Sequence, residues 1–453
     1  MHERDTATDV LTQAVLRYAV DRMRLDPPPL DGPRTPAELQ AMAGRTISPG
    51  GVGGLEALRI FADVLAPACI SVDHPRYLSF VPAAPTEAAI LFDLVVGASS
   101  VYGGSWLEGS GAVFAENAAL AWIVELVGFG RQAGGVFVAG GSAGNLSALV
   151  AARHRWRQQV PEAATRRGLV IASESVHSSI IAAARVMDVD VLKVHADARG
   201  RLHGDALHAA VAELDADARA RVFALVATAG TTNAGVVDDL AGAADCAAAN
   251  GWWFHADGAY GGAALAARSV RHLFDGIERA DSFVVDPHKW LFAPYDCCAL
   301  IYRDPVAARG AHTQHAEYLD VLTESDEWNP SDFAYHLTRR ARGLPFWFSL
   351  ATYGTSRYAD AVEQCLTLAR DAADLVTASP HTELVIEPEL SVVLFRRLGW
   401  SAADYHAWSS RVLAEGLTLT VPTSWAGETV LRFCFVNPRT TVADVQLILD
   451  ALA

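Results

Sequence analysis

VFVAGGSAGNLSALVAAR, residues 136–153, places an apolar run, a glycine-rich turn and a helical pattern in direct succession. The run 136–139 predicts a strand, and the spacing that follows Asn145 predicts a helix. Between them, Gly140–Gly144 matches the G-x-S-x-G pattern of a nucleophile elbow. The same geometry forms a phosphate cradle, because small residues let backbone N–H groups and a helix N-terminus face an anion. Ser142 therefore either attacks a substrate or holds an anionic group.

The composition is that of a globular chain with a large core. Of 453 residues, 51% are hydrophobic and 19% are charged, and the formal net charge is −16. The high apolar share indicates a buried subunit interface. The acidic balance, with no run of five or more basic residues, argues against nucleic acid or an anionic membrane surface as a partner.

Cysteine spacing and the N-terminal sequence favour a soluble cytoplasmic protein. The six cysteines are scattered without a C-x-x-C pair, which favours reduced thiols over a disulfide framework. The N-terminal stretch MHERDTATDVLTQAV is charged and has no apolar signal core. The most apolar segment, 88–104, contains Asp93 and is too short to span a bilayer.

Short apolar runs alternate with Ala-rich helical patterns through the middle of the chain. Helices are expected at 145–158, 177–187, 205–214 and 239–249, and strands at 135–139, 169–173, 190–195, 221–228, 252–255, 283–286 and 298–302. This alternation predicts an α/β fold with a parallel sheet covered on both faces. Ligands of such sheets bind at the carboxyl ends of the strands.

The patterns divide the chain into four parts. We expect an N-terminal helical segment (1–75), a large cofactor-binding domain (76–310) and a small C-terminal α+β domain (344–453). Between the last two, residues 311–343 are predicted to form a mobile active-site loop and connector. Much of this region is polar and has no clear period, and a loop of that length is more often functional than decorative.

Two further strand ends carry residues that point to chemistry. Asp257 follows the run in GWWFHADGAYGG, and Lys289 follows the run in DSFVVDPHKW. With the glycine turn, these strand ends would present a phosphate nest, a carboxylate and a lysine at one edge of the sheet. Pyridoxal phosphate chemistry uses this set, because the nest holds the phosphate, the lysine forms a Schiff base and the carboxylate keeps the pyridine nitrogen protonated.

Two other chemistries are weighed against this one. Asp257 and His288 could bind a metal, but a third ligand with matching spacing is not evident, so we expect no metal site. A serine hydrolase requires an acid and then a histidine after Ser142. With 15 histidines in the chain, the sequence singles out no such pair. Hydrolysis at Ser142 stays the alternative from a different enzyme class.

The segments HADGAYGG (255–262) and VVDPHKWLFAPYDCCALIYRD (284–304) resemble the pyridoxal-phosphate decarboxylases of the aromatic-L-amino-acid and glutamate decarboxylase group (group II). The resemblance continues, in matching order, through 74–95, 134–153, 173–184, 227–240 and 339–354, and so covers most of the chain. It implies the aspartate-aminotransferase-like fold (fold type I), with a mostly parallel seven-stranded sheet. It also implies pyridoxal 5′-phosphate as cofactor and a homodimer with the active site at the interface.

The resemblance implies roles around the ring of the cofactor. Lys289 would carry the cofactor, and Asp257 would pair with the pyridine nitrogen. Ala259 would pack under the ring, and His177 would stack on the opposite face near the substrate carboxylate. Asp238 would either orient this layer or lie exposed at a helix start.

The same resemblance assigns the phosphate end. Gly141 and Ser142 would bind the phosphate with help from His288, and Thr232 would lie near the cofactor. Ser142 would then hold an anion rather than attack a substrate. Asp286 stands where animal enzymes carry Asn, and because an acid facing a phosphate is unfavourable, we expect Asp286 to turn away.

The implied reaction is decarboxylation of an L-amino acid to an amine and CO2, completed by a loop tyrosine that crosses the dimer interface. Phe333 aligns with that tyrosine, and Tyr335 lies two positions later. Phenylalanine cannot donate a proton, and in relatives this exchange accompanies oxygen-consuming conversion to an aldehyde. Two hypotheses follow: Tyr335 or His336 replaces the tyrosine, or the product is an aldehyde.

The family pocket matches Phe80, Val81, Pro82 and Trp106, whose apolar and aromatic character favours an aromatic L-amino acid over glutamate. Ala83 replaces the hydroxyl-bearing residue of catechol-binding relatives, which disfavours a dihydroxylated ring. A basic diamino acid stays an alternative, because Glu87 and Glu108 are near in sequence.

Overall fold

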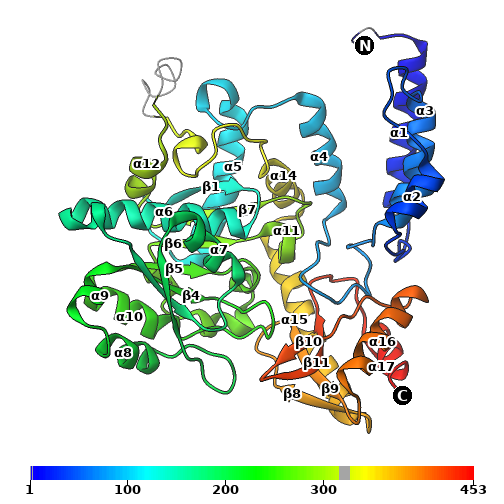
Figure 1. Cartoon of the computed structure of the whole chain (residues 1–453). Helices are drawn as coiled ribbons and strands as arrows, with labels where there is room; N and C mark the ends of the chain where they lie inside the picture. Colours follow the sequence, from blue (N-terminus) through cyan, green and yellow to red (C-terminus); the bar gives the residue numbers. More distant parts are fainter. Residues whose placement is uncertain (1, 3, 316–326) are drawn as a thin grey trace.

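The computed structural model describes residue 2, residues 4–315 and residues 327–453. Its large domain is built on one seven-stranded sheet with the order β1-β7-β6-β5-β4-β2-β3 (Figure 1). The strands are β1 (Gly134–Val138), β2 (Leu169–Ser173), β3 (Asp190–Val194), β4 (Val222–Thr228), β5 (Trp253–Asp257), β6 (Ser282–Val285) and β7 (Cys298–Tyr302). The strands β2 to β6 are parallel, and β7 runs antiparallel to both of its neighbours. The predicted α/β fold and its mostly parallel sheet are confirmed.

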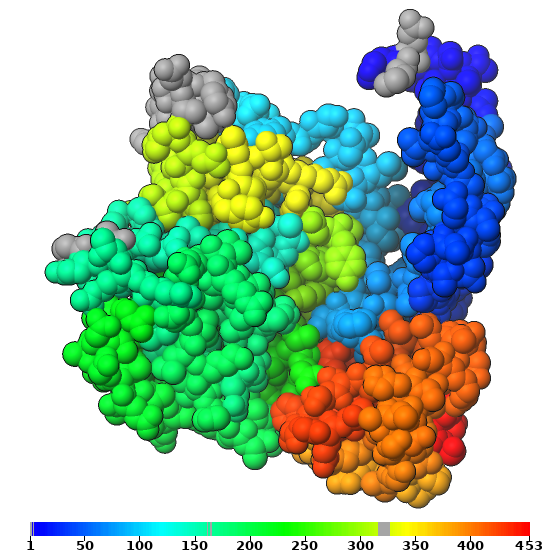
Figure 2. Space-filling view, viewed as in Figure 1, coloured from blue at the N-terminus to red at the C-terminus, as the bar shows by residue number. Residues whose placement is uncertain are grey.

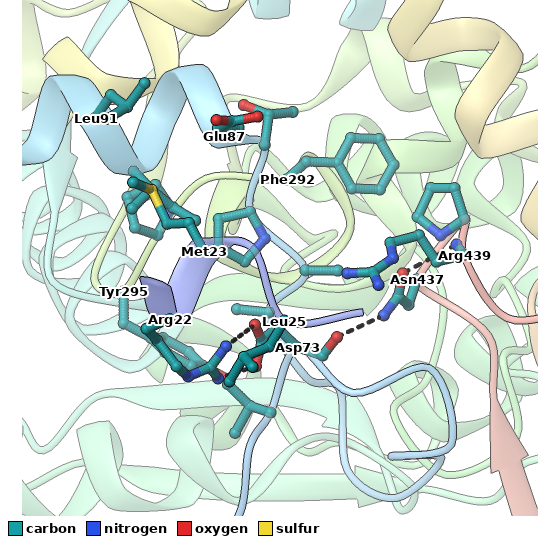
Figure 3. A pocket seen from close by; sticks show the side chains of 18 of the residues that line it. Arg22, Met23, Leu25, Asp73, Glu87, Leu91, Phe292, Tyr295, Asn437 and Arg439 are labelled. Carbon is teal, nitrogen blue, oxygen red and sulfur yellow. Dashed lines mark hydrogen bonds and ion pairs between the residues drawn. The ribbon is translucent and has the colours of Figure 1, made fainter. Parts of the chain in front are cut away.

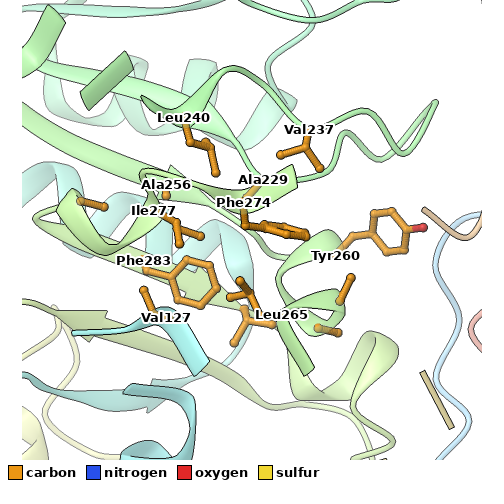
Figure 4. Packing of buried hydrophobic residues seen from close by; sticks show 14 of the residues in the cluster. Val127, Ala229, Val237, Leu240, Ala256, Tyr260, Leu265, Phe274, Ile277 and Phe283 are labelled. Carbon is orange, nitrogen blue, oxygen red and sulfur yellow. The ribbon is translucent and has the colours of Figure 1, made fainter. Parts of the chain in front are cut away.

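Helices cover both faces of this sheet. One face packs against α6 (Gly141–Gln159), α7 (Ser178–Met187) and α12 (Val306–His312). The other packs against α5 (Trp106–Val127), α8 (Gly204–Ala212), α10 (Leu240–Asn250) and the 3-10 turns of 261–279 (Figure 4). The short α9 (Ala216–Arg221) leads directly into β4. All seven residues of β4 are buried, as expected for a central strand covered on both sides.

Helix α5 is apolar because it lies in the core. Among the described residues it is the one helix that is long and apolar enough to cross a bilayer, yet 50% of its apolar window is buried inside the molecule. It packs against β1 and β7 of the sheet. The apolar segment 88–104, which we expected to be too short to span a bilayer, forms most of the neighbouring helix α4 (Glu87–Ser99). This helix packs against α14 (Leu344–Tyr353).

The first three helices form an N-terminal arm that stands beside the body of the molecule (Figure 1). The arm consists of α1 (Thr6–Met23), α2 (Pro36–Ala43) and α3 (Gly54–Ile60). After Ile60, α3 continues as a π turn at Phe61–Leu65 and a 3-10 turn at Ala66–Ala68. Pro67 explains the end of the regular helix, since it has no N–H to donate to the preceding turn.

The C-terminal part is an α+β unit. Helix α14 is followed by α15 (Thr355–Ala378), with a break at Gly354, whose φ is +78°. The four-stranded antiparallel sheet β10-β11-β9-β8 is flanked by α16 (Ala402–Ala414) and α17 (Val442–Asp450). Its strands are β8 (Thr382–Ile386), β9 (Val392–Arg397), β10 (Thr423–Trp425) and β11 (Glu428–Cys434). Before β10, Leu419 pairs with the backbone of Arg76 and Leu78, which connects this unit to the segment that follows the N-terminal arm.

The described part of the predicted mobile loop is a packed connector. Residues 316–326 of that prediction lie outside the described residues. Beyond them, Phe333 is only 3% exposed and stacks on Trp328 with ring centroids 3.9 Å apart. Arg339 is buried and forms two hydrogen bonds, of 2.7 and 2.8 Å, with the Glu116 carboxylate on α5. This ion pair and this stack connect residues 327–343 to the core, and the mobility of the loop stays a prediction.

We expect the Glu116–Arg339 pair to be essential for attaching the connector. Glu116→Ala leaves the Arg339 charge buried without its partner and also removes the acceptor of the Gly343 N–H. Breaking a buried pair in this way costs about 3–5 kcal/mol. Thermal unfolding followed by circular dichroism should show a clearly lower melting temperature.

Glu415→Ala is the matched control, because it removes the exposed ion pair with Arg411 at a helix surface. Exposed pairs contribute little, so its melting temperature should stay near that of the unmodified protein. Equal shifts in the two variants would contradict the importance given to the buried pair.

Candidate active site

Three strand ends meet at one edge of the large sheet. Because β7 runs antiparallel to both neighbours, β1 points the same way as β6. Gly140 after β1, Asp257 at the end of β5 and Asp286 after β6 therefore lie at the same edge. They line a cavity of about 350 Å³ whose wall also includes His177, Thr232 and Lys289. The structure thus brings together the cofactor residues expected from the sequence, which are Gly141, Ser142, His177, Thr232, Asp257, Ala259, His288 and Lys289.

The glycine turn forms the cradle at the start of α6. A Cβ at Gly141 would lie 2.9 Å from the Cβ of Ala259 and 3.2 Å from Asp286 Oδ2, so a side chain there would fill the cradle. The first N–H groups of a helix have no acceptor within the helix, and the helix dipole adds positive potential at this end. This end of the cavity is therefore suited to an anion such as a phosphate.

Lys289 lies on α11 (Pro287–Trp290), a single helical turn directly after β6. The next residue, Trp290, is fully buried and stacks on Tyr260 with ring centroids 5.5 Å apart, which fixes the turn. Lys289 Nζ lies 2.8 Å from Asp286 Oδ2. Burial lowers the pKa of Lys289, but the neighbouring Asp286 carboxylate more than compensates, so the net direction is upward.

Asp257 is held by hydrogen bonds from two directions. Its Oδ2 accepts from Asn145 Nδ2 at 2.8 Å, and its Oδ1 accepts from the Ala259 N–H at 3.1 Å. Asn145 Oδ1 in turn lies 2.8 Å from His255 Nε2. Burial lowers the pKa of His255 to about 4, so the ring is neutral at physiological pH, and it carries its proton on Nε2 because Asn145 Oδ1 can only accept.

This network continues to both sides. Behind His255, Ser282 Oγ lies 2.8 Å from His255 Nδ1 and accepts from Trp253 Nε1 at 2.7 Å. On the cavity side, Asn145 Nδ2 also donates to Ser179 Oγ at 2.9 Å, and Ser179 Oγ lies 2.8 Å from His177 Nδ1. His177 Nδ1 also accepts the Ser179 N–H, which leaves Nε2 as the ring nitrogen available to the cavity.

The remaining predicted residues complete the wall. His288 Nδ1 accepts the Cys297 N–H at 2.9 Å, while Nε2 lies 3.7 Å from Asp286 Oδ2. The alternative of an exposed Asp238 was wrong. That side chain is 2% exposed and accepts the backbone N–H groups of Leu202 and Thr228, because its neighbour Asp239 caps α10 instead. Burial raises the pKa of Asp238 to about 7.

Asp286 differs from the expectation that it turns away from the cradle. Its carboxylate faces Gly141, and its side chain is 2% exposed. The ion pair with Lys289 explains this orientation. Burial raises the pKa of Asp286, whereas the charges of Lys289 and His288 lower it further than burial raises it.

The four predicted substrate residues do not line this cavity. Phe80 is 62% exposed, Val81 and Pro82 are buried, and the Trp106 N–H at the start of α5 donates to Asn329 Oδ1. Phe80, Val81 and Pro82 precede α4, and Trp106 is the first residue of α5, so all four lie away from the carboxyl edge in the single chain. Their role in substrate binding at a subunit interface stays a prediction. Glu108 is also absent from the wall and hydrogen-bonds to Ser105.

A second cavity of about 830 Å³ lies next to the first. It is lined by Ala83 to Glu87, by Phe292, Tyr353 and Tyr358, and by the Arg22–Asp73 ion pair (Figure 3). Tyr295 lines both cavities and so forms their common wall. Of the segment that begins at Phe80, only the residues from Ala83 onward line this second cavity.

Sequence reasoning missed Asn145 and Tyr295. Asn145 stands in the quoted glycine-turn segment, one helical turn after Gly141, and that spacing was the available signal. Tyr295 lies within the lysine motif but carries no charge that marks it as functional. Both are recognised from the cavity they line.

The residues present fit pyridoxal phosphate. The glycine cradle accommodates a phosphate, Lys289 is placed for a Schiff base, and Asp257 is a buried carboxylate for the pyridine nitrogen. The arrangement does not support hydrolysis by Ser142. His288, which lies beside Gly140, accepts the Cys297 N–H and directs its other nitrogen toward Asp286, so it is not oriented as a base for Ser142.

Known proteins similar to this chain include decarboxylases and an aldehyde synthase. An aromatic-L-amino-acid decarboxylase of Bacillus atrophaeus is 30% identical over 390 residues, which cover 83% of this chain and 80% of the relative. An L-2,4-diaminobutyrate decarboxylase of Acinetobacter baumannii is 28% identical, with 79% and 74% covered. A phenylacetaldehyde synthase of Arabidopsis thaliana is 28% identical, with 75% and 72% covered.

The fold has a close counterpart among solved structures. The crystal structure of Oryza sativa TDC with PLP and tryptamine matches with a TM-score of 0.91 at 24% identity, covering 100% of this chain and 98% of that chain. This likeness confirms fold type I. The family model described as the pyridoxal-dependent decarboxylase conserved domain matches residues 56–398. The chain therefore belongs to the pyridoxal-dependent decarboxylase family and is a pyridoxal-phosphate-dependent amino acid carboxy-lyase.

Proposed function

We propose that this enzyme decarboxylates an aromatic L-amino acid to the corresponding amine and CO2, as a cytoplasmic homodimer. The observation that carries the proposal is the cavity at the carboxyl edge, where Lys289, Asp257 and the glycine cradle converge. When bound, pyridoxal phosphate supplies the electron sink that accepts the electron pair left behind by departing CO2.

We assign the residues as follows. Lys289 would hold the cofactor covalently through its side-chain amine. Asp257, oriented by Asn145, holds the proton of the pyridine nitrogen. Gly141 and Ser142 would bind the phosphate, and His177, whose Nε2 is the ring nitrogen available to the cavity, would interact with the substrate carboxylate. Apolar surroundings weaken the hydration of that carboxylate, which assists loss of CO2.

An aromatic substrate is supported by the walls of the second cavity. Phe292, Tyr295 and Tyr353 line it together with apolar residues of α4, and its Asp73 is already neutralised by Arg22. Glu87, the other acidic residue of this cavity wall, has no ion-pair partner among the described residues, and it is exposed. A diamino acid would need a buried acid for its second ammonium group. We therefore propose diamino acids, the substrate class of the diaminobutyrate relative, only as the second candidate substrate class.

We propose Tyr335 rather than Phe333 as the proton donor. Phe333 is enclosed in its own chain, whereas Tyr335 is 54% exposed and contacts His336 edge to face. Burial, together with Arg339 and Arg342, lowers the pKa of His336 to about 4, so this ring is neutral and cannot itself act as an acid near pH 7. An exposed phenol can reach a partner subunit, which a buried phenyl ring cannot.

Exposed apolar side chains of the N-terminal arm support the homodimer. No residue of α1 is buried, although Val10, Val15, Leu16 and Val20 are apolar. On α4, Leu91, Leu94 and Val95 are exposed as well. Figure 2 shows the arm separated from the upper body of the same chain. Exposed apolar surface of this extent is typical of an association surface.

The first prediction concerns the covalent attachment of the cofactor. The sequence contains only two lysines, Lys193 and Lys289. Borohydride reduction of the cofactor-loaded protein should therefore attach the cofactor to Lys289 alone, as mapped by peptide mass spectrometry. Lys289→Ala should abolish the visible Schiff-base band, whereas Lys193→Ala is the matched control and should keep it. Labelling of Lys193 would contradict the assignment.

The second prediction concerns substrate and product. We expect purified enzyme to convert an aromatic L-amino acid to amine and CO2 without hydrogen peroxide. A panel that includes L-2,4-diaminobutyrate and L-glutamate, with amine, aldehyde, CO2 and peroxide measured together, tests this. Preference for the diamino acid would contradict the substrate proposal. Aldehyde with peroxide would contradict the product and favour the aldehyde-synthase alternative.

The third prediction separates the two loop residues. Tyr335→Phe should lower amine formation by about 10²-fold or more, because a general acid contributes a factor of this order. The Schiff-base band should stay unchanged. Phe333→Leu should instead lower the melting temperature while the product stays the same. An unaltered rate in Tyr335→Phe would exclude Tyr335 as the donor.

A further inference from the structure

The glycine cradle at the start of α6 already contains an anionic side chain, the Asp286 carboxylate. Asp286 Oδ2 would lie 3.2 Å from a Cβ placed on Gly141, and Oδ1 would lie 3.4 Å from it. The carboxylate therefore stands at the first residue of α6, which is 19 residues long. It uses the positive end of this helix and the Lys289 ammonium, 2.8 Å away, as its counter-charges.

One oxygen of this carboxylate lacks a strong hydrogen-bond donor, although the Cys298 thiol interacts with the carboxyl group. Oδ1 is buried and has no nitrogen or oxygen hydrogen-bond partner among the described residues. A buried acceptor without a donor is costly unless a ligand or a proton satisfies it. The side chain cannot escape to water, because it is only 2% exposed.

Binding of a phosphate here would bring a second anion into the same enclosed space. Two buried anions this close cannot both keep their full charge without a large penalty, and one of them takes up a proton instead. The groups that face Asp286 offer no further permanent positive charge. They are Lys289 and His288 on α11, Cys298 on β7, and Tyr295, with Asp257 near Lys289 and Asp296 near His288.

Resting on the proposed function, we propose that Asp286 takes up one proton from solvent when the phosphate of the cofactor enters the cradle. The carboxyl then becomes a hydrogen-bond donor to the phosphate, and its ion pair with Lys289 is released. One O–H bond forms on Asp286, with the proton taken from solvent. The covalent attachment at Lys289 releases one water and is the same for pyridoxal and pyridoxal phosphate, so it cancels when the two ligands are compared. Cofactor retention is thereby coupled to pH through a residue outside the Schiff base and the pyridine nitrogen.

The sign of the coupling follows from linkage. The free protein holds Asp286 ionised, because Lys289 keeps the pKa of this carboxyl below its usual value. If the complex binds one more proton than the free protein, affinity falls as pH rises, by up to about tenfold per pH unit. Asn at this position donates without a proton, so Asp286→Asn should lose this part of the pH dependence.

The test is a titration of cofactor-free protein with pyridoxal phosphate above about pH 7, where the second ionisation of a phosphate monoester is largely complete. Affinity of the unmodified protein should fall more steeply with pH than that of Asp286→Asn, by up to about tenfold per unit. Calorimetry in buffers of different ionisation enthalpy should show about one more proton taken up by the unmodified protein.

Two controls isolate the residue and the ligand group. Asp296→Asn removes another acid of the same cavity, paired with Arg342, and should keep the proton uptake. Pyridoxal, which lacks the phosphate, should bind the unmodified protein without the extra proton. This comparison needs no variant and remains decisive if Asp286→Asn does not fold.

Equal proton uptake with pyridoxal and pyridoxal phosphate would overturn the inference, as would parallel pH profiles for the unmodified protein and Asp286→Asn. Absence of a Schiff-base band in every protein that retains Lys289 would overturn the proposed function, and the inference with it. A normal band with no difference in proton uptake would overturn only the inference.

Discussion

The hydrogen bond from Asn145 Nδ2 to Asp257 Oδ2 is the interaction on which the active site depends. It joins the first turn of α6 to the end of β5, and the same amide contacts His255 and Ser179. Because all these groups are buried, each unsatisfied donor or acceptor would cost free energy, so the network tolerates essentially one arrangement. The phosphate end and the ring end of the site are therefore positioned by a single side chain.

This arrangement links two residues on different elements. Asp257 belongs to β5, and His177 caps α7. Asn145 donates directly to Asp257 and is connected to His177 through Ser179. The Asp257 carboxylate fixes the orientation of the Asn145 amide, because a carboxylate only accepts and therefore takes the Nδ2–H, which turns Oδ1 toward His255 Nε2. Orientation of the carboxylate and of the His177 ring is thus determined from within the core rather than from the cavity.

The sequence predicted the parts of the site that follow from periodicity and topology. Apolar strands of the expected length end at Asp257 and just before Asp286, and parallel strands bring such ends to one edge. It did not predict Asn145, because a polar residue in the first turn of a helix is common and its partner is 112 positions away. Nor did it predict that Asp286 faces the cradle, since that depends on the charge of Lys289.

Residues whose position depends on distant segments were predicted least well. The polar neighbours of Phe333 predict a loop residue, but Phe333 stacks on Trp328, and the Arg339–Glu116 pair, 223 positions apart, attaches the same connector to α5. Phe80 lies before α4, and Trp106 begins α5. How these two helices pack against the rest of the chain cannot be predicted from a local sequence pattern. By contrast, Lys289 was predicted from the sequence because its position depends on adjacent residues. The strand before it, the proline turn and the buried Trp290 together place its side chain at the carboxyl edge. A residue of this site could be predicted from the sequence when its neighbours in the chain determine its position, whatever its importance to the chemistry.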